Sequence, residues 1–410
     1  MPHSRWVPLR FRLPRALPPL LAMTLTVAGG CREDTEPTAP DPGPALATTP
    51  VQGLSFRQVS AAAGHTCGVT TGNRAYCWGL NYRGELGNGT TTDHLRPVLV
   101  TGGLRFSQVS VGLDHSCGLT VDSLAYCWGG NSFGGLGDGT TTDHLKPLPV
   151  AGGLRFRQVS AGTFHTCGIT TANEVFCWGT STGAGRFDEL GANQRAFPFQ
   201  LGAGLHFRDV SAGFSTVLGQ FTCAITLDNV PYCWGENDFA QLGLGSNGGL
   251  FPRPVPVTGD HRFRQVSAGA TRTCALNINR LAFCWGANWY GGVGDGTIIQ
   301  RTAPVRVARG LAFLDLADGG EYHACGIALD ARAYCWGLNG NGQLGDGTAT
   351  NRLKPVAVAG GLQFRQLSTG SGYTCGVTTD HVAYCWGRGG GQLGNGTTAG
   401  SLKPVPVAAP

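Results

Sequence analysis

A segment of about fifty residues recurs seven times along the chain, and each copy holds two cysteines ten residues apart. The second cysteines of successive copies are separated by 50, 50, 56, 51, 51 and 50 residues. Repetition at this period indicates a propeller or a solenoid, in which each repeat buries its apolar face only against its neighbours. The seven pairs are Cys67 with Cys77, Cys117 with Cys127, Cys167 with Cys177, Cys223 with Cys233, Cys274 with Cys284, Cys325 with Cys335, and Cys375 with Cys385.

The high content of glycine and proline indicates which secondary structure the repeat forms. The chain has 66 Gly and 23 Pro among 410 residues, and both residue types weaken helix interiors, so a mainly helical repeat is excluded. Disorder is excluded as well, because 41% of the residues are apolar and 9% are aromatic. The remaining fold class is all-β, with short strands and tight turns.

Each copy is predicted to form four antiparallel strands, A to D. In the first copy these are Phe56–Ala61, His65–Thr70, Ala75–Gly79 and Pro97–Val100. A compact turn around Gly72, with Gly and Asn where a positive φ costs little, joins B to C.

A hairpin centred on Gly72 places Cys67 directly opposite Cys77, so a cross-strand disulfide is expected in each copy. Closing so short a loop contributes about 2–3 kcal/mol in the chain-entropy model. Metal ligation is the alternative, but zinc sites usually have closer ligand spacing such as C-x2-C, which the chain lacks. Seven disulfides predict an oxidising compartment.

Strand alternation places Tyr76 and Trp78 on one face of the sheet, with Cys77 and Val69 on the other. A sheet that is apolar on both faces is buried on both, as in blades stacked around a ring. The tryptophan is therefore interpreted as a wedge between blades. It recurs at Trp78, Trp128, Trp178, Trp234, Trp285, Trp336 and Trp386. The repeated histidines are interpreted as structural and the Gly-Asp-Gly-Thr segments as turns, so we expect no metal and no cofactor. The histidines are His65, His115, His165 and His323.

The first fifty residues differ from the rest. Four arginines and no acid precede an apolar run from Leu20 to Ala28, the pattern of an export signal. Ala28-Gly29-Gly30-Cys31 resembles a bacterial lipobox, which predicts lipidation at Cys31; an ordinary signal peptide is the alternative. Residues 1–30 are thus expected to be a lipoprotein-type signal, 31–50 a disordered tether rich in Pro and Thr, and 51–410 the repeat domain. Without residues 1–30 the net charge falls from +5 to +1, which does not indicate nucleic acid.

The repeat resembles that of the regulator of chromosome condensation family. The residues that carry the resemblance are Ala62-Ala63-Gly64-His65-Thr66, Cys77-Trp78-Gly79-Leu80-Asn81 and Gly342–Thr348, and it covers residues 51–410. It implies a seven-bladed β-propeller of four-stranded blades, whose ring closes by pairing strands from the two chain ends. The last strand, Pro404–Val407, should then pack beside the first blade.

Candidate binding residues lie where the copies differ. The A–B and C–D loops share one rim, and the C–D loops vary most, as loops that bind partners do. Copy three has an atypical C–D loop over 182–192, and the next A–B loop is five residues longer. The predicted rim site contains Tyr82, Phe133, Arg186, Phe187, Phe214, Leu218, Phe239, Trp289 and Tyr290. The alternative is that these side chains only pack against neighbouring loops.

We expect a non-enzymatic, monomeric propeller that binds an envelope or extracellular protein or glycan and touches the membrane only through its lipid anchor. The expected location is the bacterial outer membrane or cell surface, with a periplasmic or secreted protein as the alternative. A hydrolase or lyase is the competing function class, which a cluster of acids and histidine on the rim would favour. Nuclear members of the family are guanine-nucleotide exchange factors, and the export signal argues against that activity here.

Overall fold

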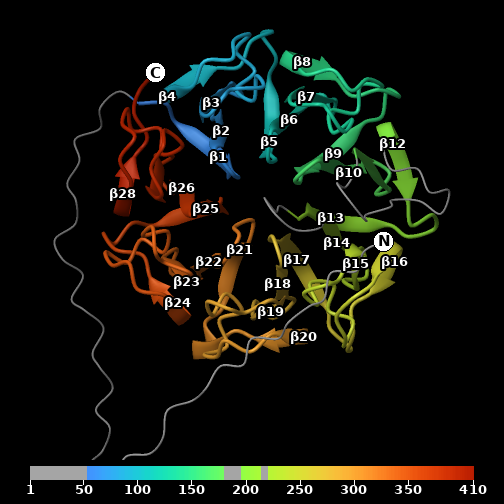
Figure 1. Cartoon of the computed structure of the whole chain (residues 1–410), viewed down its shortest axis with the longest axis vertical. Helices are drawn as coiled ribbons and strands as arrows, with labels where there is room; N and C mark the ends of the chain where they lie inside the picture. Colours follow the sequence, from blue (N-terminus) through green and yellow to red (C-terminus); the bar gives the residue numbers. More distant parts are fainter. Residues whose placement is uncertain (1–52, 180–194, 214–219) are drawn as a thin grey trace, which may run out of the picture. The chain divides into compact units, whose positions relative to one another are not determined.

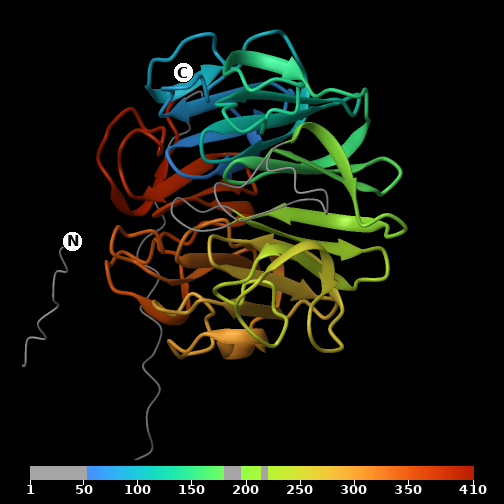
Figure 2. The same ribbon diagram turned by 45° about the vertical axis from the view of Figure 1, so that its right-hand side comes forward.

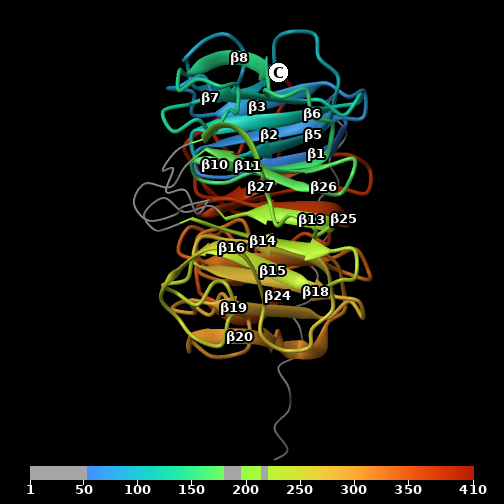
Figure 3. The same ribbon diagram turned by 90° about the vertical axis from the view of Figure 1, so that its right-hand side faces the viewer.

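The computed structural model describes residues 53–179, 195–213 and 220–410, and these form a ring of seven four-stranded antiparallel sheets (Figure 1). Within every blade the strands are adjacent in chain order, so each repeat builds one complete blade. The predicted seven-bladed propeller is therefore confirmed. Turned by 90°, the ring is seen edge on, with the blades stacked one against the next (Figure 3).

The first strand of every blade lies next to the central channel and the fourth lies at the periphery (Figure 1). The innermost strands are β1 (Phe56–Ala61), β5 (Phe106–Val111), β9 (Phe156–Ala161), β13 (Phe207–Ala212), β17 (Phe263–Ala268), β21 (Phe313–Ala317) and β25 (Phe364–Thr369). The second strands are β2 (His65–Thr70), β6 (His115–Thr120), β10 (His165–Thr170), β14 (Phe221–Thr226), β18 (Arg272–Asn277), β22 (His323–Ala328) and β26 (Tyr373–Thr378).

The outer half of each blade is more exposed. The third strands are β3 (Ala75–Gly79), β7 (Ala125–Gly129), β11 (Val175–Gly179), β15 (Pro231–Glu236), β19 (Ala282–Gly286), β23 (Ala333–Gly337) and β27 (Ala383–Gly387). The outermost strands are β4 (His94–Leu99), β8 (His144–Pro149), β12 (Arg195–Leu201), β16 (Leu250–Pro256), β20 (Arg301–Arg306), β24 (Arg352–Ala357) and β28 (Ser401–Pro406). A short 3-10 helix, η1 (Ala308–Gly310), follows β20. Within the described ranges no helix is long and apolar enough to cross a membrane.

Two details of the repeat differ from the sequence prediction. The fourth strand of blade one begins at His94 rather than Pro97, because Pro97 lies on an edge strand where a missing N–H is tolerated. In the B–C turn the left-handed residue is Asn73, with φ of 64°, and not Gly72. Asn tolerates this conformation because its short side chain bonds locally.

The seven predicted cysteine pairs are all disulfides, one in each blade. The expected register is confirmed, since Cys67 lies directly opposite Cys77 between β2 and β3. The bridges join Cys67 to Cys77, Cys117 to Cys127, Cys167 to Cys177, Cys223 to Cys233, Cys274 to Cys284, Cys325 to Cys335, and Cys375 to Cys385.

The disulfides are equivalent in position as well as in pairing. Within each pair the Cα atoms are 4.0–4.1 Å apart, and all fourteen cysteines are buried. In every blade the bridge connects the second strand to the third. Each bridge therefore joins two strands of one blade and leaves the contacts between blades to other side chains.

The tryptophans fill the space between blades, as predicted. All seven are fully buried, and each cluster of buried apolar residues joins one face of a blade to the facing side of the next. Trp128, for example, packs with the disulfide side of blade one, and its indole N–H donates to the Glu85 carbonyl at 2.8 Å. Figure 2 shows these neighbouring sheets packed in layers. The interior is thus a circle of equivalent inter-blade cores.

The ring does not close in the way that the family resemblance implied. The last blade is β25–β28 alone, and no sheet of the described residues mixes strands from the two ends of the chain. The seventh repeat supplies all four of its own strands, so closure depends on contacts between separate blades, both main-chain bonds such as Ser371 N to Ala62 O at 2.7 Å and side-chain bonds. The Tyr373 hydroxyl contacts Thr66 Oγ1 at 2.9 Å and donates to the His65 carbonyl at 2.8 Å. The expected packing of the last strand against the first blade is present, since Val405 packs on the cluster that contains Phe56.

Candidate binding rim

The C–D loops present pairs of side chains at the rim through a repeated β-turn. The turn begins at a buried asparagine and closes three residues later, as between Asn288 O and Gly291 N at 3.1 Å. Its two central residues point away from the blade and are free to vary. Described turns of this kind expose Tyr82-Arg83, Ser132-Phe133, Asp238-Phe239, Trp289-Tyr290 and Gly340-Asn341.

Asn288 fixes the loop of blade five. Its side-chain N–H groups donate to the carbonyls of Thr297 and Ile299 at 3.0 and 3.1 Å, and its Oδ1 accepts from Val293 N at 2.9 Å. A buried amide that uses both its donors and its acceptor holds the main chain in one conformation. Trp289 and Tyr290 are therefore presented from a rigid base.

Aromatic side chains from three blades meet at this point. The Trp289 ring lies 5.3 Å from Phe239 of blade four and 6.0 Å from Tyr322 of blade six, measured between ring centroids. Tyr290 also contacts Tyr322, at 5.3 Å. The rings meet edge to face or tilted, which is the favoured geometry for aromatic pairs. Despite these contacts Trp289 is 45% exposed and Tyr290 is 40% exposed.

Two exposed isoleucines lie on the same loop. Ile298 and Ile299 are 61% and 60% exposed and occupy the loop positions that hold Thr91 and Thr92 in blade one. Asn288 brings this part of the loop beside the Trp289 turn through its bond to the Ile299 carbonyl. We name the set of Phe239, Trp289, Tyr290, Ile298, Ile299 and Tyr322 the blade-five patch.

The loops that form the patch are acidic. The C–D loops of blades four and five (236–249 and 287–300) and the A–B loops of blades five and six (269–271 and 318–322) contain no lysine or arginine. They contain five acids: Glu236, Asp238, Asp295, Asp318 and Glu321. Asp295 is paired with Arg301, and Asp318 with the buried Arg272. Burial and, to a lesser extent, the nearby Asp238 raise the pKa of Glu236.

The other predicted site residues lie elsewhere. Tyr82 is on blade one and is 61% exposed, whereas Phe133 of blade two packs on Phe164 at a centroid distance of 4.6 Å. Among the predicted residues that the structure describes, Phe239, Trp289 and Tyr290 come together. Arg186, Phe187, Phe214 and Leu218 lie outside the described residues.

The sequence prediction did not include three members of the patch, Tyr322, Ile298 and Ile299. Tyr322 stands just before His323 at an A–B position that also holds Gly64 and Asp114 in other copies, so its variation was visible in the sequence. The isoleucines were visible as a departure from Thr-Thr. Nothing in the sequence alone placed these residues beside Trp289.

Acids and a histidine do meet on another part of the rim, between blades one and two. Asp114 Oδ1 lies 3.7 Å from His115 Nδ1, and Arg83 Nη1 lies 3.4 Å from Asp114 Oδ2. Burial raises the pKa of Glu85 to about 7. However, His115 is buried and its Nε2 contacts Thr166 Oγ1 of the next blade at 2.9 Å, so this imidazole has the structural role predicted for it.

The other repeated histidines also bridge blades. The Nε2 atoms of His65 and His323 contact Ser116 and Thr374 in the following blade, each at 2.8 Å. Burial lowers the pKa of both imidazoles to about 3, so they are neutral near pH 7. In the described parts of the chain, no three His, Cys, Asp or Glu side chains are grouped so that they could hold a metal ion.

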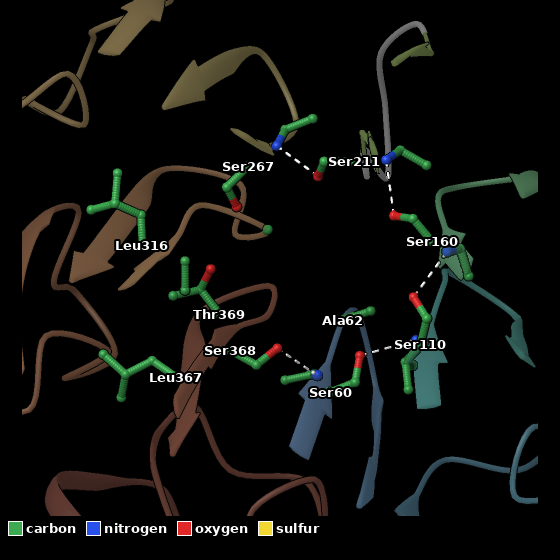
Figure 4. Close-up of a pocket in the computed structure, with 17 residues that line it drawn as sticks. Ser60, Ala62, Ser110, Ser160, Ser211, Ser267, Leu316, Leu367, Ser368 and Thr369 are labelled. Carbon is green, nitrogen blue, oxygen red and sulfur yellow. Dashed lines mark hydrogen bonds between the residues drawn. The ribbon is translucent and has the colours of Figure 1, made fainter. Parts of the chain in front are cut away.

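A polar cavity of about 160 Å³ opens at the central channel. It is lined by serines of the innermost strands, whose hydroxyls accept main-chain N–H bonds from the next blade, as Ser60 does from Val111 at 3.1 Å (Figure 4). Ser110 and Ser160 repeat this contact at 2.9 Å each. The serines therefore join neighbouring blades.

Models of the regulator of chromosome condensation (RCC1) repeat match residues 73–119, 122–169, 231–276 and 330–377, and a second model matches 56–85 and 106–134; together they cover about half of the chain. The probable E3 ubiquitin-protein ligase HERC4 of Homo sapiens is 31% identical over 160 residues, which is 38% of this chain and 15% of HERC4. The ultraviolet-B receptor UVR8 of Arabidopsis thaliana is 30% identical over 157 residues, 38% of this chain and 34% of UVR8.

Among solved structures, that of Prp20p from Saccharomyces cerevisiae, described together with its binding to Gsp1p and histones, superposes with a TM-score of 0.72 at 19% identity. The match covers 87% of each chain. At this identity the likeness concerns the fold, and the matched curated relatives extend well beyond the part that they share with this chain.

Proposed function

Because this chain belongs to the regulator of chromosome condensation repeat family, we propose that it is a non-enzymatic scaffold that binds a protein partner through the blade-five patch. The observation that carries the proposal is the exposure of Trp289, Tyr290, Ile298 and Ile299 on one anchored loop. Exposed aromatic anchors on a rigid base are typical of binding hot spots, because little conformational entropy is lost when a partner docks.

A protein suits this surface better than a glycan. Sugars stack on aromatic rings but also need polar groups arranged around their hydroxyls, and here the loop that carries Trp289 and Tyr290 also carries two exposed isoleucines. Apolar side chains next to Trp and Tyr are typical of the centre of a protein interface. Glycan binding remains the alternative that the experiment below distinguishes.

The structure supports an enzymatic function less than it supports a binding function. The acid and histidine cluster of blades one and two directs its imidazole into a contact with Thr166, and Arg83 lies against its carboxylate. A hydrolase or lyase at this cluster is the second candidate, favoured by the raised pKa of Glu85. Loss of a measured activity on Glu85→Gln, without any fall in the melting temperature, would identify it.

The seven disulfides support export to an oxidising compartment. We propose that the chain acts in a bacterial envelope, anchored by lipid at Cys31, which lies outside the described residues. The same disulfides argue against nucleotide exchange in a nucleus. Metabolic labelling with a palmitate analogue, compared between the native chain and Cys31→Ser, tests the anchor.

Crosslinking and affinity capture from the native envelope test the binding function. The full chain should capture a specific protein, and the double variant Trp289→Ala/Tyr290→Ala should lose it. The matched control is Tyr82→Ala, which removes a more exposed aromatic residue from the equivalent turn of blade one. Equal capture by all three proteins would show that the patch is not the binding site. Capture of an oligosaccharide instead of a protein would favour the glycan alternative.

A further inference from the structure

The charge around the blade-five patch restricts the kinds of partner that can bind there. Four loops meet there without a lysine or arginine, and they carry Glu236 and Asp238 in addition to Asp295 and Asp318, which are paired with arginines. Asp238 is exposed and is the neighbour of Phe239 in the same turn. The apolar surface is therefore bordered by negative charge.

The rim is not uniformly acidic, which makes this part of it distinct. Between blades one and two the guanidinium of Arg83 lies 3.4 Å from Asp114 and 3.6 Å from Asp143, so those carboxylates have a cation beside them. Neither Glu236 nor Asp238 has an ion pair with a described residue. At blade four an approaching partner therefore meets two carboxylates that have no arginine or lysine of the described ranges paired with them.

This charge excludes some occupants of an exposed aromatic and aliphatic surface. An anionic lipid surface or an acidic polysaccharide would be repelled. A polypeptide that carries Lys or Arg between apolar residues would be attracted both by the negative charge and by the apolar surface. Its cations can lie over the exposed faces of Trp289 and Tyr290 and reach the carboxylates, while its apolar side chains cover Ile298 and Ile299.

We infer that the blade-five patch binds a cationic segment of a partner protein, in which Lys or Arg alternates with apolar residues. The inference rests on the proposed function and specifies its ligand. Trp289 provides the means to test it, since the other seven tryptophans in the described residues are fully buried. In the full chain carrying Trp6→Phe, which removes the ninth tryptophan, quenching of tryptophan fluorescence by acrylamide therefore reports chiefly on the patch.

The probes are two tryptophan-free nonapeptides, one alternating Lys and Leu and one alternating Glu and Leu, titrated into the full chain with its disulfides intact. The Lys-Leu peptide should reduce acrylamide quenching, and raising the salt from 50 to 500 mM should weaken its binding at least tenfold, because its attraction is partly electrostatic. The Glu-Leu peptide should have no effect. Neutral chitohexaose and vesicles of anionic lipid are tested in parallel.

Variants of the carboxylates and of Tyr290 separate the electrostatic from the aromatic contribution to peptide binding. Glu236→Gln/Asp238→Asn should weaken binding of the Lys-Leu peptide about tenfold without changing the quenching of the free protein. Tyr290→Ala should weaken it by a similar factor, and Tyr82→Ala should leave it unchanged. Melting temperatures confirm that each variant is folded.

These measurements distinguish failure of the cationic-segment inference from failure of the proposed binding function. If the two peptides bind equally, or if the carboxylate variant binds as the native chain does, the inference about the cationic segment is wrong. Envelope capture that still depends on Trp289 and Tyr290 would then leave the proposed function standing. Protection of Trp289 by chitohexaose or by vesicles alone would overturn both the cationic segment and the choice of a protein.

Discussion

Gln366 of the last blade holds the main chain of Val59 in the first blade with two hydrogen bonds. Its Oε1 accepts from Val59 N at 2.9 Å, and its Nε2 donates to Val59 O at 3.0 Å. Gln58 makes the same pair of contacts with Val109 in the second blade, both at 3.0 Å. The junction where the two chain ends meet thus uses the clamp that joins blades linked by the chain.

Gln366→Ala should open the ring more readily than Gln58→Ala. Each change removes two hydrogen bonds and leaves main-chain groups of the next blade without partners, which costs about 1–3 kcal/mol of unfolding free energy. Blades one and two stay tethered by the chain, whereas the last and first blades do not. Urea unfolding and native-state proteolysis should show the larger effect for Gln366→Ala. Equal proteolysis of the two variants would mean that this clamp does not control closure.

Removing one disulfide should weaken one blade. Cys67→Ala/Cys77→Ala is expected to lower the unfolding free energy by about 2–3 kcal/mol, since the bridge no longer restricts the unfolded chain. Chemical denaturation of the two proteins measures the difference. Unreduced protein from the native host should give seven intramolecular bridges by mass spectrometry of its peptides. Free thiols at these positions would remove the argument for an oxidising compartment.

The buried histidines should make the protein less stable in acid. Burial lowers the pKa of His65 and His323 to about 3 and that of His165 to about 4. In the unfolded chain an imidazole has a pKa near 6.5, so between these values the unfolded state binds more protons than the folded state. The contribution of each histidine is fully present above pH 6.5 and is lost as the pH falls, by about 1–2 kcal/mol between pH 7 and pH 5.

His323→Gln tests this pH dependence. Glutamine can keep a polar contact with Thr374 but cannot take up a proton. We expect the difference in unfolding free energy between pH 7 and pH 5 to shrink by the contribution of one histidine, when urea titrations at the two pH values are compared with those of the native chain. An unchanged difference would show that this imidazole does not gain a proton on unfolding.

Glu85 should affect the pH dependence of stability in the opposite direction to the histidines. Burial raises its pKa to about 7, whereas an unfolded glutamate titrates near pH 4.5, so the folded state binds the extra proton and stability falls as pH rises between these values. Glutamine occupies the same place at Gln241 and Gln343, where Oε1 accepts from main-chain N at 2.8 and 2.9 Å. Glu85 accepts the corresponding bond from Arg83 N at 2.9 Å.

Glu85→Gln is therefore expected to stabilise the protein by about 1–3 kcal/mol at pH 8 and by less at pH 5. Thermal unfolding at the two pH values measures both effects. A variant that is less stable at pH 8 would show that the carboxylate is needed in its charged form.

Much of the fold was predictable because the same pattern of strand, turn and cysteine residues occurs seven times in the sequence. Trp78 and Cys77 alternate within one strand, and this alone requires a sheet buried on both faces. The ten-residue spacing of the cysteines also predicted the hairpin register that the structure shows between Cys67 and Cys77. These are local relationships, which depend on strand period and turn length.

Ring closure and the patch could not be predicted in the same way, because they depend on contacts between distant parts of the chain. The clamp of Gln366 on Val59 joins residues 307 positions apart, and the family resemblance implied a shared sheet instead. Phe239, Trp289 and Tyr322 belong to three repeats, and each taken alone is one more aromatic residue in a variable loop. The order of residues along the chain was enough to define the blade and the number of blades. Which variable residues share a surface depended on the packing of blades around the ring, because that surface forms where neighbouring loops meet.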